Sequence, residues 1–295
     1  MPCFSNSLVA FDTWLILKNM FSFKPCNFSK SLFVFGKIYV LSLLIFTLNR
    51  FIFFFRFAEP DLFSNQATEL WEVMKLGFRF DTKIIIVLLL PLLALSILLT
   101  LIYTPGFQRL CQKIYYWYTI VLLSVTTFLL FVDQQYYTYF QSHFNGMIFG
   151  LVQDDTVAVL ISMWKDHPVL RIVFVVVLFT ITIHFILKQI LKNLTENIHL
   201  KWYSNSAIAL LSIFLIFSGI RGSYSTFPLE KDDLNISDHP FINYLASNAF
   251  FALHTTIEDR SRTIGDDMDN GKLLSSNGYN SIDEVLFDYY DNKKN

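Results

Sequence analysis

Hydrophobic residues along this chain gather into five blocks separated by polar segments. Four blocks approach the roughly 20 residues that an α-helix needs to cross the hydrocarbon core of a bilayer. The fifth is shorter, but Lys201 and Arg221 bound it. The blocks cover residues 32–55, 84–103, 114–132, 170–190 and 207–220. The pattern predicts an all-α membrane protein built on a bundle of five transmembrane helices.

Basic residues collect in alternate connections between the blocks. The second and third blocks are joined through Arg109 and Lys113, and the fourth and fifth through Lys188, Lys192 and Lys201. The connection between the third and fourth blocks is acidic instead. Because lysine and arginine in short loops mark the cytoplasmic side, the N-terminus is expected inside and the C-terminus outside. This alternation requires an odd number of spans.

The two connections expected on the outer side have helical periodicity. The first has apolar residues spaced as on one face of a helix, and the second has a shorter stripe that Pro168 ends. We expect both to form amphipathic helices that lie in the membrane interface or pack on the bundle as short lids. The stripes are Ala67, Leu70, Trp71, Met74 and Phe78, and then Val157, Leu160, Ile161 and Trp164.

The chain changes character after the fifth block, where it becomes polar and acidic. Two helices are predicted there: one over residues 240–256, and one that starts at Ser281 with a capping box. Residues 260–280 are expected to be flexible. The predicted domains are a cytoplasmic segment (1–31), the five-helix domain (32–220) and an extracytoplasmic linker (221–295).

Composition excludes several classes of function. Hydrophobic residues make up 54% of the chain and charged residues 16%, below the roughly 25% of soluble domains. The net charge of -1 gives no attraction to nucleic acid, so no nucleic-acid partner is expected. The three cysteines and the outer histidines, including His143, lack the spacing of a metal site. Hydrolase and phosphate-loop motifs are missing, so no catalytic, cofactor-binding or metal-ligating residue is predicted.

Few ionisable residues fall inside the apolar blocks. Lys37 and Arg50 lie near block ends, where long side chains can reach the headgroups. His184 is expected to form a hydrogen bond with a neighbouring helix. No block carries a carboxylate near its centre, which argues against a proton-coupled transporter. Asp133 and the tyrosines that follow the third block are explained by an aromatic belt at the interface.

Three charged residues are candidates for contact with a phospholipid headgroup: Arg79, Asp81 and Arg221. Arg79 and Asp81 precede the second block, and Arg221 follows the fifth, so all three are expected in the same interfacial layer. The planar guanidinium of arginine can hold a phosphate through two hydrogen bonds. The alternatives are a local ion pair between Arg79 and Asp81, and a plain membrane anchor for Arg221.

The order of four motifs resembles the membrane half of the lipoteichoic acid synthase family. A G-x-R-x-D segment precedes the second block, an acidic and aromatic segment follows the third, and G-x-R-G-S leaves the fifth. An N-x-L-A-x-N helix then follows, with Ala249 in place of the usual proline. The segments are Gly77 to Asp81; Asp133 with Tyr136, Tyr137 and Phe140; Gly219 to Ser223 with Phe227-Pro228-Leu229; and Asn243 to Phe250.

This resemblance implies the membrane-anchoring, lipid-facing module of a bacterial phosphoglycerol- or phosphoethanolamine-type transferase. Members of the family carry a sulfatase-like catalytic domain after this region, with a threonine nucleophile and a divalent metal. No residue here matches either, so the metal would belong to that further domain, and we expect this chain to be inactive alone. The expected partners are membrane phospholipid and a catalytic domain in a downstream or separate chain, and the expected location is the bacterial cytoplasmic membrane. The alternative is a freestanding membrane scaffold that binds lipid or a partner.

Overall fold

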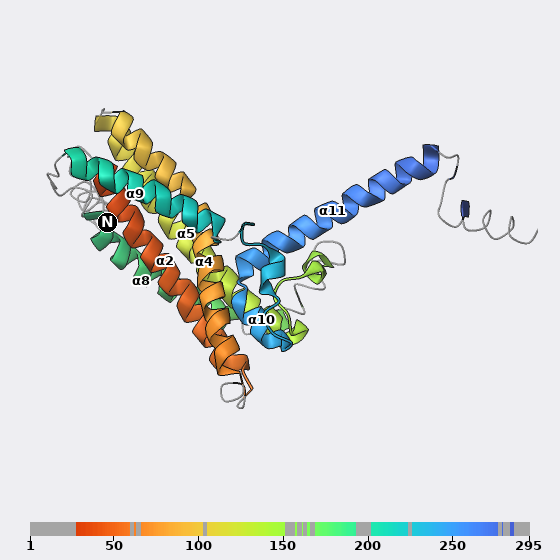
Figure 1. Cartoon of the computed structure of the whole chain (residues 1–295). Helices are drawn as coiled ribbons and strands as arrows, with labels where there is room; N and C mark the ends of the chain where they lie inside the picture. The colour runs from red at the N-terminus through yellow and green to blue at the C-terminus, as the bar shows by residue number, and fades with distance from the viewer. Residues whose placement is uncertain are drawn as a thin grey trace, which may run out of the picture.

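The described part of the structure, a computed structural model, is helical, with no strand among its residues. It comprises residues 28–59, 62, 66–102, 105–150, 157, 161, 164–165, 169–192, 202–223, 226–276, 279 and 284–285. Long helices gather into one bundle, with short helices at one end of it (Figure 1). The bundle helices are α2 (Phe28–Phe57), α4 (Ala67–Leu101), α5 (Pro105–Phe140), α8 (Val169–Lys192) and α9 (Trp202–Arg221). The all-α prediction is confirmed for these residues.

Four of the described helices are long and apolar enough to cross a membrane, which makes this a multi-pass membrane protein. The spans are Ser31–Phe57, Ala67–Leu98, Arg109–Phe140 and Val169–Leu191. The apolar part of α9, Ser206–Arg221, is shorter. Large apolar side chains such as Phe174 and Phe217 are exposed on the bundle surface, where a bilayer would solvate them. The count of five spans and the orientation stay predictions.

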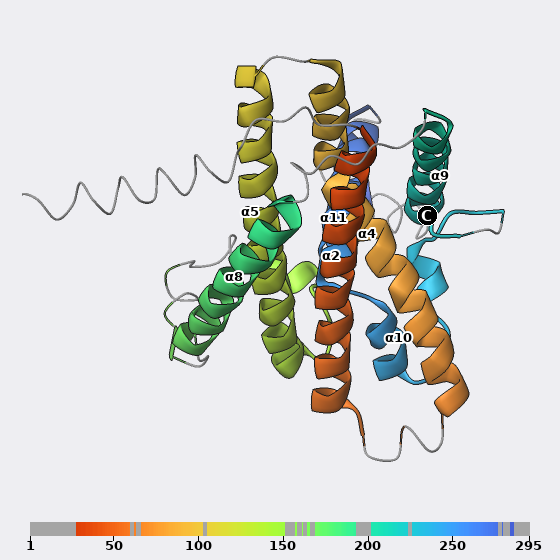
Figure 2. The ribbon, with the colours of Figure 1, turned by 90° about the vertical axis from the view of Figure 1, so that its left-hand side faces the viewer.

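The bundle core is formed where α2 packs against α4, and α5 against both α4 and α8 (Figure 2). One fully buried side chain from each of these helices illustrates it: Ile38, Leu89, Leu123 and Leu187. The helix α9 packs on the outside of α2 and α4. Each helix therefore has one face in the core and another directed outward.

A second apolar cluster lies at the end of the bundle where α2 ends and α4 begins. It brings together these helix ends and residues 226–256, which we call the cap. The cap contains the 3-10 helix η3 (Lys231–Leu234), the helix α10 (Pro240–Ala246) and the first turns of α11 (Ala249–Ser276). The buried members of the cluster include Phe53, Val73, Phe80, Leu229, Ile242 and Leu245. Beyond the cap, α11 projects away from the bundle (Figure 1).

The predicted amphipathic helix before the second span is present, but it is the continuous beginning of α4. Its predicted apolar stripe does not form one buried face. Trp71 and Phe78 are 64% and 50% exposed, whereas Leu70, Leu76 and the neighbouring Val73 are buried. The reason is that the cap packs on this stretch of α4, so the buried face is the one turned toward α10.

The predicted helix over residues 240–256 is interrupted at Ser247 and Asn248, where α10 ends and α11 begins. The side chain of Asn248 accepts a hydrogen bond from the backbone N–H of Phe251 at 2.9 Å, which is the geometry of an N-cap. The segment from residue 260, which the sequence predicts to be flexible, is helical as far as Ser276, where α11 ends. The predicted helices over 157–164 and from Ser281 lie largely outside the described residues.

Candidate functional site

A buried ion pair joins the bundle to the cap. Arg50 of α2 donates to Asp81 of α4 at 2.7 Å, and the two side chains are 7% and 1% exposed. Asn248 donates to the same carboxylate oxygen at 3.0 Å. The guanidinium of Arg50 also donates to the carbonyl oxygens of Leu245 and Ser247 at the end of α10. Buried charges are tolerated when they are paired and hydrogen-bonded in this way.

Gly77 provides the space that Arg50 occupies. A Cβ atom at position 77 would lie 2.2 Å from a guanidinium nitrogen of Arg50. Gly77 and Asp81 are four residues apart, so they share one face of α4, and this face is turned toward α2. The glycine and the aspartate of the Gly77–Asp81 segment therefore serve the same partner: one makes room for Arg50 and the other neutralises it.

A second buried pair lies beside the first. Asp133 near the end of α5 accepts a hydrogen bond from His143 Nδ1 at 2.6 Å, and the backbone N–H of Phe144 faces its other oxygen at 3.3 Å. His143 Nε2 donates to the carbonyl oxygen of Tyr244 at 2.8 Å. Both ring nitrogens thus face acceptors, which favours the imidazolium form.

Two opposing effects set the pKa of His143. Burial alone would lower it, because a charged ring is costly away from water. The charge and hydrogen bond of Asp133, together with the hydrogen bond to Tyr244, outweigh this effect and raise the pKa above the ordinary histidine value. The nearby charge of Arg50 opposes the rise.

The two pairs form one polar layer between the apolar cores of the bundle and the cap. Arg50, Asp81, Asp133 and His143 line the same small internal cavity of about 10 Å³. A cavity of this size has room for about one water molecule and none for a substrate. Within the described residues, no group of three histidine, cysteine, aspartate or glutamate side chains is placed to hold a metal ion. This layer therefore orients the cap and is not a binding pocket.

A larger cavity of about 880 Å³ lies between α2, α4 and α9, and we call it the interhelix cavity. Its apolar wall takes side chains from all three helices, among them Phe35, Ile86 and Leu215. Arg79 and Asp233 contribute charged groups to the lining. The cavity thus combines a long apolar wall with a few charged and polar groups, the division expected for an amphipathic ligand.

Arg79 is exposed and is held in place by the turn that follows α9. Its Nε donates to the carbonyl oxygen of Gly222 at 2.6 Å, so one of its five N–H donors is engaged by a described contact. Gly222 has φ of +65°, a conformation that favours glycine, and a Cβ there would approach Leu229 at 3.0 Å. Lys83 holds the same turn through the carbonyl oxygen of Leu229 at 2.6 Å.

The three predicted headgroup residues have separate roles. Arg79 lines the interhelix cavity. Asp81 is buried and paired with Arg50, so the structure gives it a protein partner in place of a headgroup or Arg79. Arg221 folds over its own turn, where it donates to the carbonyl oxygens of Ser223 and Thr226, each at 3.0 Å. Only the first of the three is therefore presented to a ligand in this cavity.

The sequence left several partners unidentified. The sequence predicts Arg50 near the headgroups and Asp133 at the interface, yet both are buried and paired inside the protein. Tyr137 is likewise buried against the cap, not at an aromatic belt. The sequence did contain one indication that Arg50 is paired: a charged residue within an apolar block needs a partner. The expected hydrogen bond of His184 is confirmed, with Tyr116 of α5 as its partner.

Comparison with protein-family models, with curated proteins and with solved structures finds no match for this chain. The functional proposal therefore rests on the interhelix cavity and on the sequence motifs described above.

Proposed function

We propose that this chain is the lipid-facing membrane module of a bacterial envelope transferase that acts on phospholipid headgroups, similar to the lipoteichoic acid synthases. Its role is to hold a phospholipid in the interhelix cavity and to position a catalytic domain beside it. That domain is supplied downstream or by a separate chain. The observation that supports this role best is Arg79 on the lining of a cavity with an otherwise largely apolar wall.

The chemistry of the cavity fits a phospholipid. Its volume of about 880 Å³ lies within the range of roughly 300–1,000 Å³ seen for ligand sites. The apolar wall matches acyl chains, and the guanidinium of Arg79 matches a phosphate. Asp233 also lines the cavity, and its carboxylate complements either the ammonium of a phosphoethanolamine or the hydroxyls of a phosphoglycerol headgroup.

The proposal includes the orientation indicated by the basic residues. Five spans, with α9 as the fifth, place the N-terminus in the cytoplasm and the cap at the outer face of the membrane. Arg79 then lies near the headgroups of the outer leaflet. A catalytic domain that follows α11 would face the same leaflet.

A freestanding membrane scaffold is the second candidate function. The observation that favours it is α11, a helix of 28 residues that projects away from the bundle (Figure 1). Such a helix offers a surface to a partner protein whether or not a lipid occupies the cavity. The two functions differ in whether Arg79 and the cavity are needed.

The test is retention of lipid by the purified full-length chain, measured by native mass spectrometry after reconstitution with phosphatidylglycerol and phosphatidylethanolamine. Arg79→Ala removes the phosphate contact, and we expect about a tenfold loss of bound lipid, because hydrogen bonds to a charged group contribute about 1.5–3 kcal/mol. Gly36→Leu adds a side chain to the cavity wall, where a Cβ meets nothing within 4 Å. We expect it to displace the lipid without disturbing the fold.

Two matched variants serve as controls. Lys75→Ala removes an exposed cation one turn from Arg79 and outside the cavity lining, and Gly106→Leu adds a side chain where a Cβ is also unopposed. Both should bind lipid like the unmodified chain. Equal lipid retention by Arg79→Ala, Gly36→Leu and these controls would remove the lipid-holding role and leave the scaffold function.

A further inference from the structure

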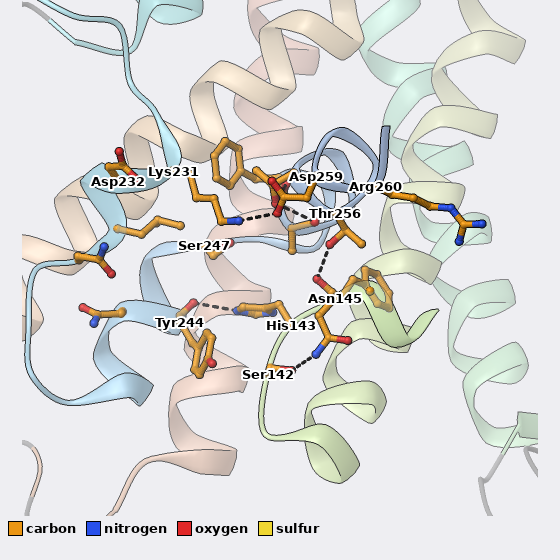
Figure 3. A pocket seen from close by; sticks show the side chains of 18 of the residues that line it. Ser142, His143, Asn145, Lys231, Asp232, Tyr244, Ser247, Thr256, Asp259 and Arg260 are labelled. Carbon is orange, nitrogen blue, oxygen red and sulfur yellow. Dashed lines mark hydrogen bonds and ion pairs between the residues drawn. The ribbon is translucent and has the colours of Figure 1, made fainter. Parts of the chain in front are cut away.

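A second large cavity, of about 680 Å³, lies against the cap, and we call it the cap cavity (Figure 3). Three parts of the chain form it: the segment after α5 with the 3-10 helix η1 (Gly146–Phe149), the region of η3, and α10 with α11. Its described lining shares no residue with that of the interhelix cavity. The two cavities are therefore separate sites.

Hydrogen bonds between these parts hold one side of the cap cavity in place. His143 is fixed to the carbonyl oxygen of Tyr244 at 2.8 Å, and Thr256 donates to the carbonyl oxygen of Phe144 at 3.0 Å. Within the segment after α5 itself, Asn145 donates to the hydroxyl oxygen of Ser142 at 2.8 Å. Figure 3 shows these contacts as dashed lines on the side of the cavity opposite Lys231. The wall is thus formed before any ligand arrives, which reduces the entropy lost on binding.

Amide, hydroxyl and aromatic groups dominate the lining. Several of these groups are already engaged within the protein: the amide oxygens of Asn145 and Asn243 each accept two hydrogen bonds, and each amide donates one N–H. The second N–H of each amide, the remaining lone pairs of the hydroxyl groups and the side-chain amide of Asn235 are left for a ligand, and the aromatic rings supply apolar faces. A molecule with many hydroxyl groups needs this combination, because each hydroxyl both donates and accepts while its C–H surface packs on a ring. Representative lining residues are Asn145, Asn235, Asn243, Thr255, Phe149 and Tyr244.

The charges around the cavity balance one another. Lys231 and Asp259 form an ion pair of 2.6 Å across one side, where both side chains are about half exposed. Arg260 lies over the ring of Phe149 at 4.1 Å, and Asp232 adds the remaining negative charge. A phosphate would have to compete with these carboxylates. The described residues also hold no cluster suited to a metal ion. An uncharged ligand is therefore favoured.

We propose that the cap cavity binds an uncharged polyhydroxylated ligand, either a saccharide or a linear polyol. The proposal rests on the cap, the segment after α5 and the first half of α11, and does not require lipid in the interhelix cavity. It gives the module a second specificity, for a hydroxyl-bearing molecule close to the membrane surface.

The test uses the reconstituted full-length chain and three probes: maltose and diglycerol, followed by saturation-transfer proton NMR, and inorganic phosphate, followed by the broadening of its 31P signal. Gly146→Leu adds a side chain to the cavity lining, where a Cβ meets nothing within 4 Å, and should abolish the signal of the bound probe. Asn235→Leu removes one polar partner and should weaken binding about threefold to tenfold. Gly36→Leu, which alters only the interhelix cavity, is the matched control and should bind the probe like the unmodified chain.

The outcomes separate the two ligand sources. A signal from maltose that Gly146→Leu abolishes supports a saccharide site, and the same result with diglycerol supports a polyol site. The proposal is overturned if neither maltose nor diglycerol binds, or if phosphate alone binds. It is also overturned if Gly146→Leu and Asn235→Leu both leave the maltose and diglycerol signals unchanged. Loss of lipid retention in Gly36→Leu with normal probe binding would show that the two sites function independently.

Discussion

Asp81 accepts hydrogen bonds from two parts of the chain through a single oxygen atom. Arg50 approaches it from α2 and Asn248 from the start of α11. The carboxylate is 1% exposed, so without these donors its charge would lie in an apolar environment. This one side chain therefore links the packing of the bundle to the attachment of the cap.

Replacement of Asp81 by alanine should destabilise the protein strongly. The change leaves the guanidinium of Arg50 buried without its counter-charge, and breaking such a pair costs about 3–5 kcal/mol. The measurement is the free energy of unfolding of the full chain in mixed micelles. Glu72→Ala, on an exposed part of the same helix, is the control and should change it by less than about 0.5 kcal/mol.

A double variant makes this prediction more specific. Arg50→Met combined with Asp81→Leu removes both charges and keeps apolar volume, so it should recover most of the lost stability. If Asp81→Ala is no worse than Glu72→Ala, the pair is not needed for the fold. If the double variant is as unstable as Asp81→Ala, the loss comes from the hydrogen bonds to the cap and not from an unpaired charge.

The attachment of the cap helix α10 to α5 should depend on pH through His143. Since the pKa of His143 is raised on folding, its contribution is fully present below the unfolded value of about 6.5 and is lost as pH rises through the higher folded value. The groups around the ring are Asp133 and Tyr137 from α5, Arg50 from α2 and Tyr244 from α10.

The measurement is the unfolding midpoint of the full chain and of His143→Gln from about pH 5 to pH 9. The unmodified chain should have the higher unfolding midpoint at low pH. The difference between the two midpoints should decrease as pH rises through the folded pKa of His143. His254→Gln alters an exposed histidine of α11 and should leave the pH profile unchanged. A gap that stays constant across the range would show that the neutral ring binds Asp133 and Tyr244 equally well.

Helices could be predicted from this sequence better than their contacts could. Blocks of apolar residues located α2, α4, α5, α8 and α9, because a continuous apolar run near bilayer length has few other solutions. The buried face of the first turns of α4 could not be predicted, since the cap that covers it lies far along the chain. Residues such as Trp71 and Val73 are both apolar, and only the position of α10 decides which is buried.

The candidate site was predictable only in part. The position of Arg79 next to the second block indicated an interfacial role, and the structure places it on a cavity lining. The pairing of Arg50 with Asp81 depends on how α2 and α4 approach each other, which a single sequence does not specify. The cap cavity needs three distant segments together, and no local pattern marks it.

At the scale of the whole molecule, the count of five spans places two described positions on opposite sides of the membrane. Gly106 lies between the second and third spans, and Ser275 lies near the end of α11. Three crossings separate them if α9 spans the membrane, and two if it does not. A membrane-impermeant maleimide should therefore label Ser275→Cys in intact cells and Gly106→Cys only after lysis, in a background without the native cysteines.

If both positions are labelled only after lysis, α9 does not span the membrane and the cap lies on the cytoplasmic side. If both are labelled in intact cells, α9 again does not span the membrane, and both positions lie outside. Labelling of Gly106→Cys alone in intact cells would reverse the whole orientation. Because the apolar part of α9 is shorter than the four spans, its crossing of the membrane is the open question, and this pair of positions answers it. The lipid leaflet that faces Arg79 follows directly from the result.

The hydrogen bond from Asn248 to Asp81 also bears on how the molecule is made. These residues are 167 positions apart, and at 5–20 residues per second the ribosome needs roughly 10–30 s to synthesise the chain between them. During that interval Arg50 and Asp81 have each other but not the carbonyl and amide groups of the cap, in a setting where unmet polar groups are costly. Once α10 and Asn248 have been synthesised, they supply the remaining hydrogen-bond partners of Arg50 and Asp81. A nascent chain that stops earlier would contain the Arg50–Asp81 pair without its hydrogen bonds to the cap. We expect membrane proteases to recognise such an incomplete chain.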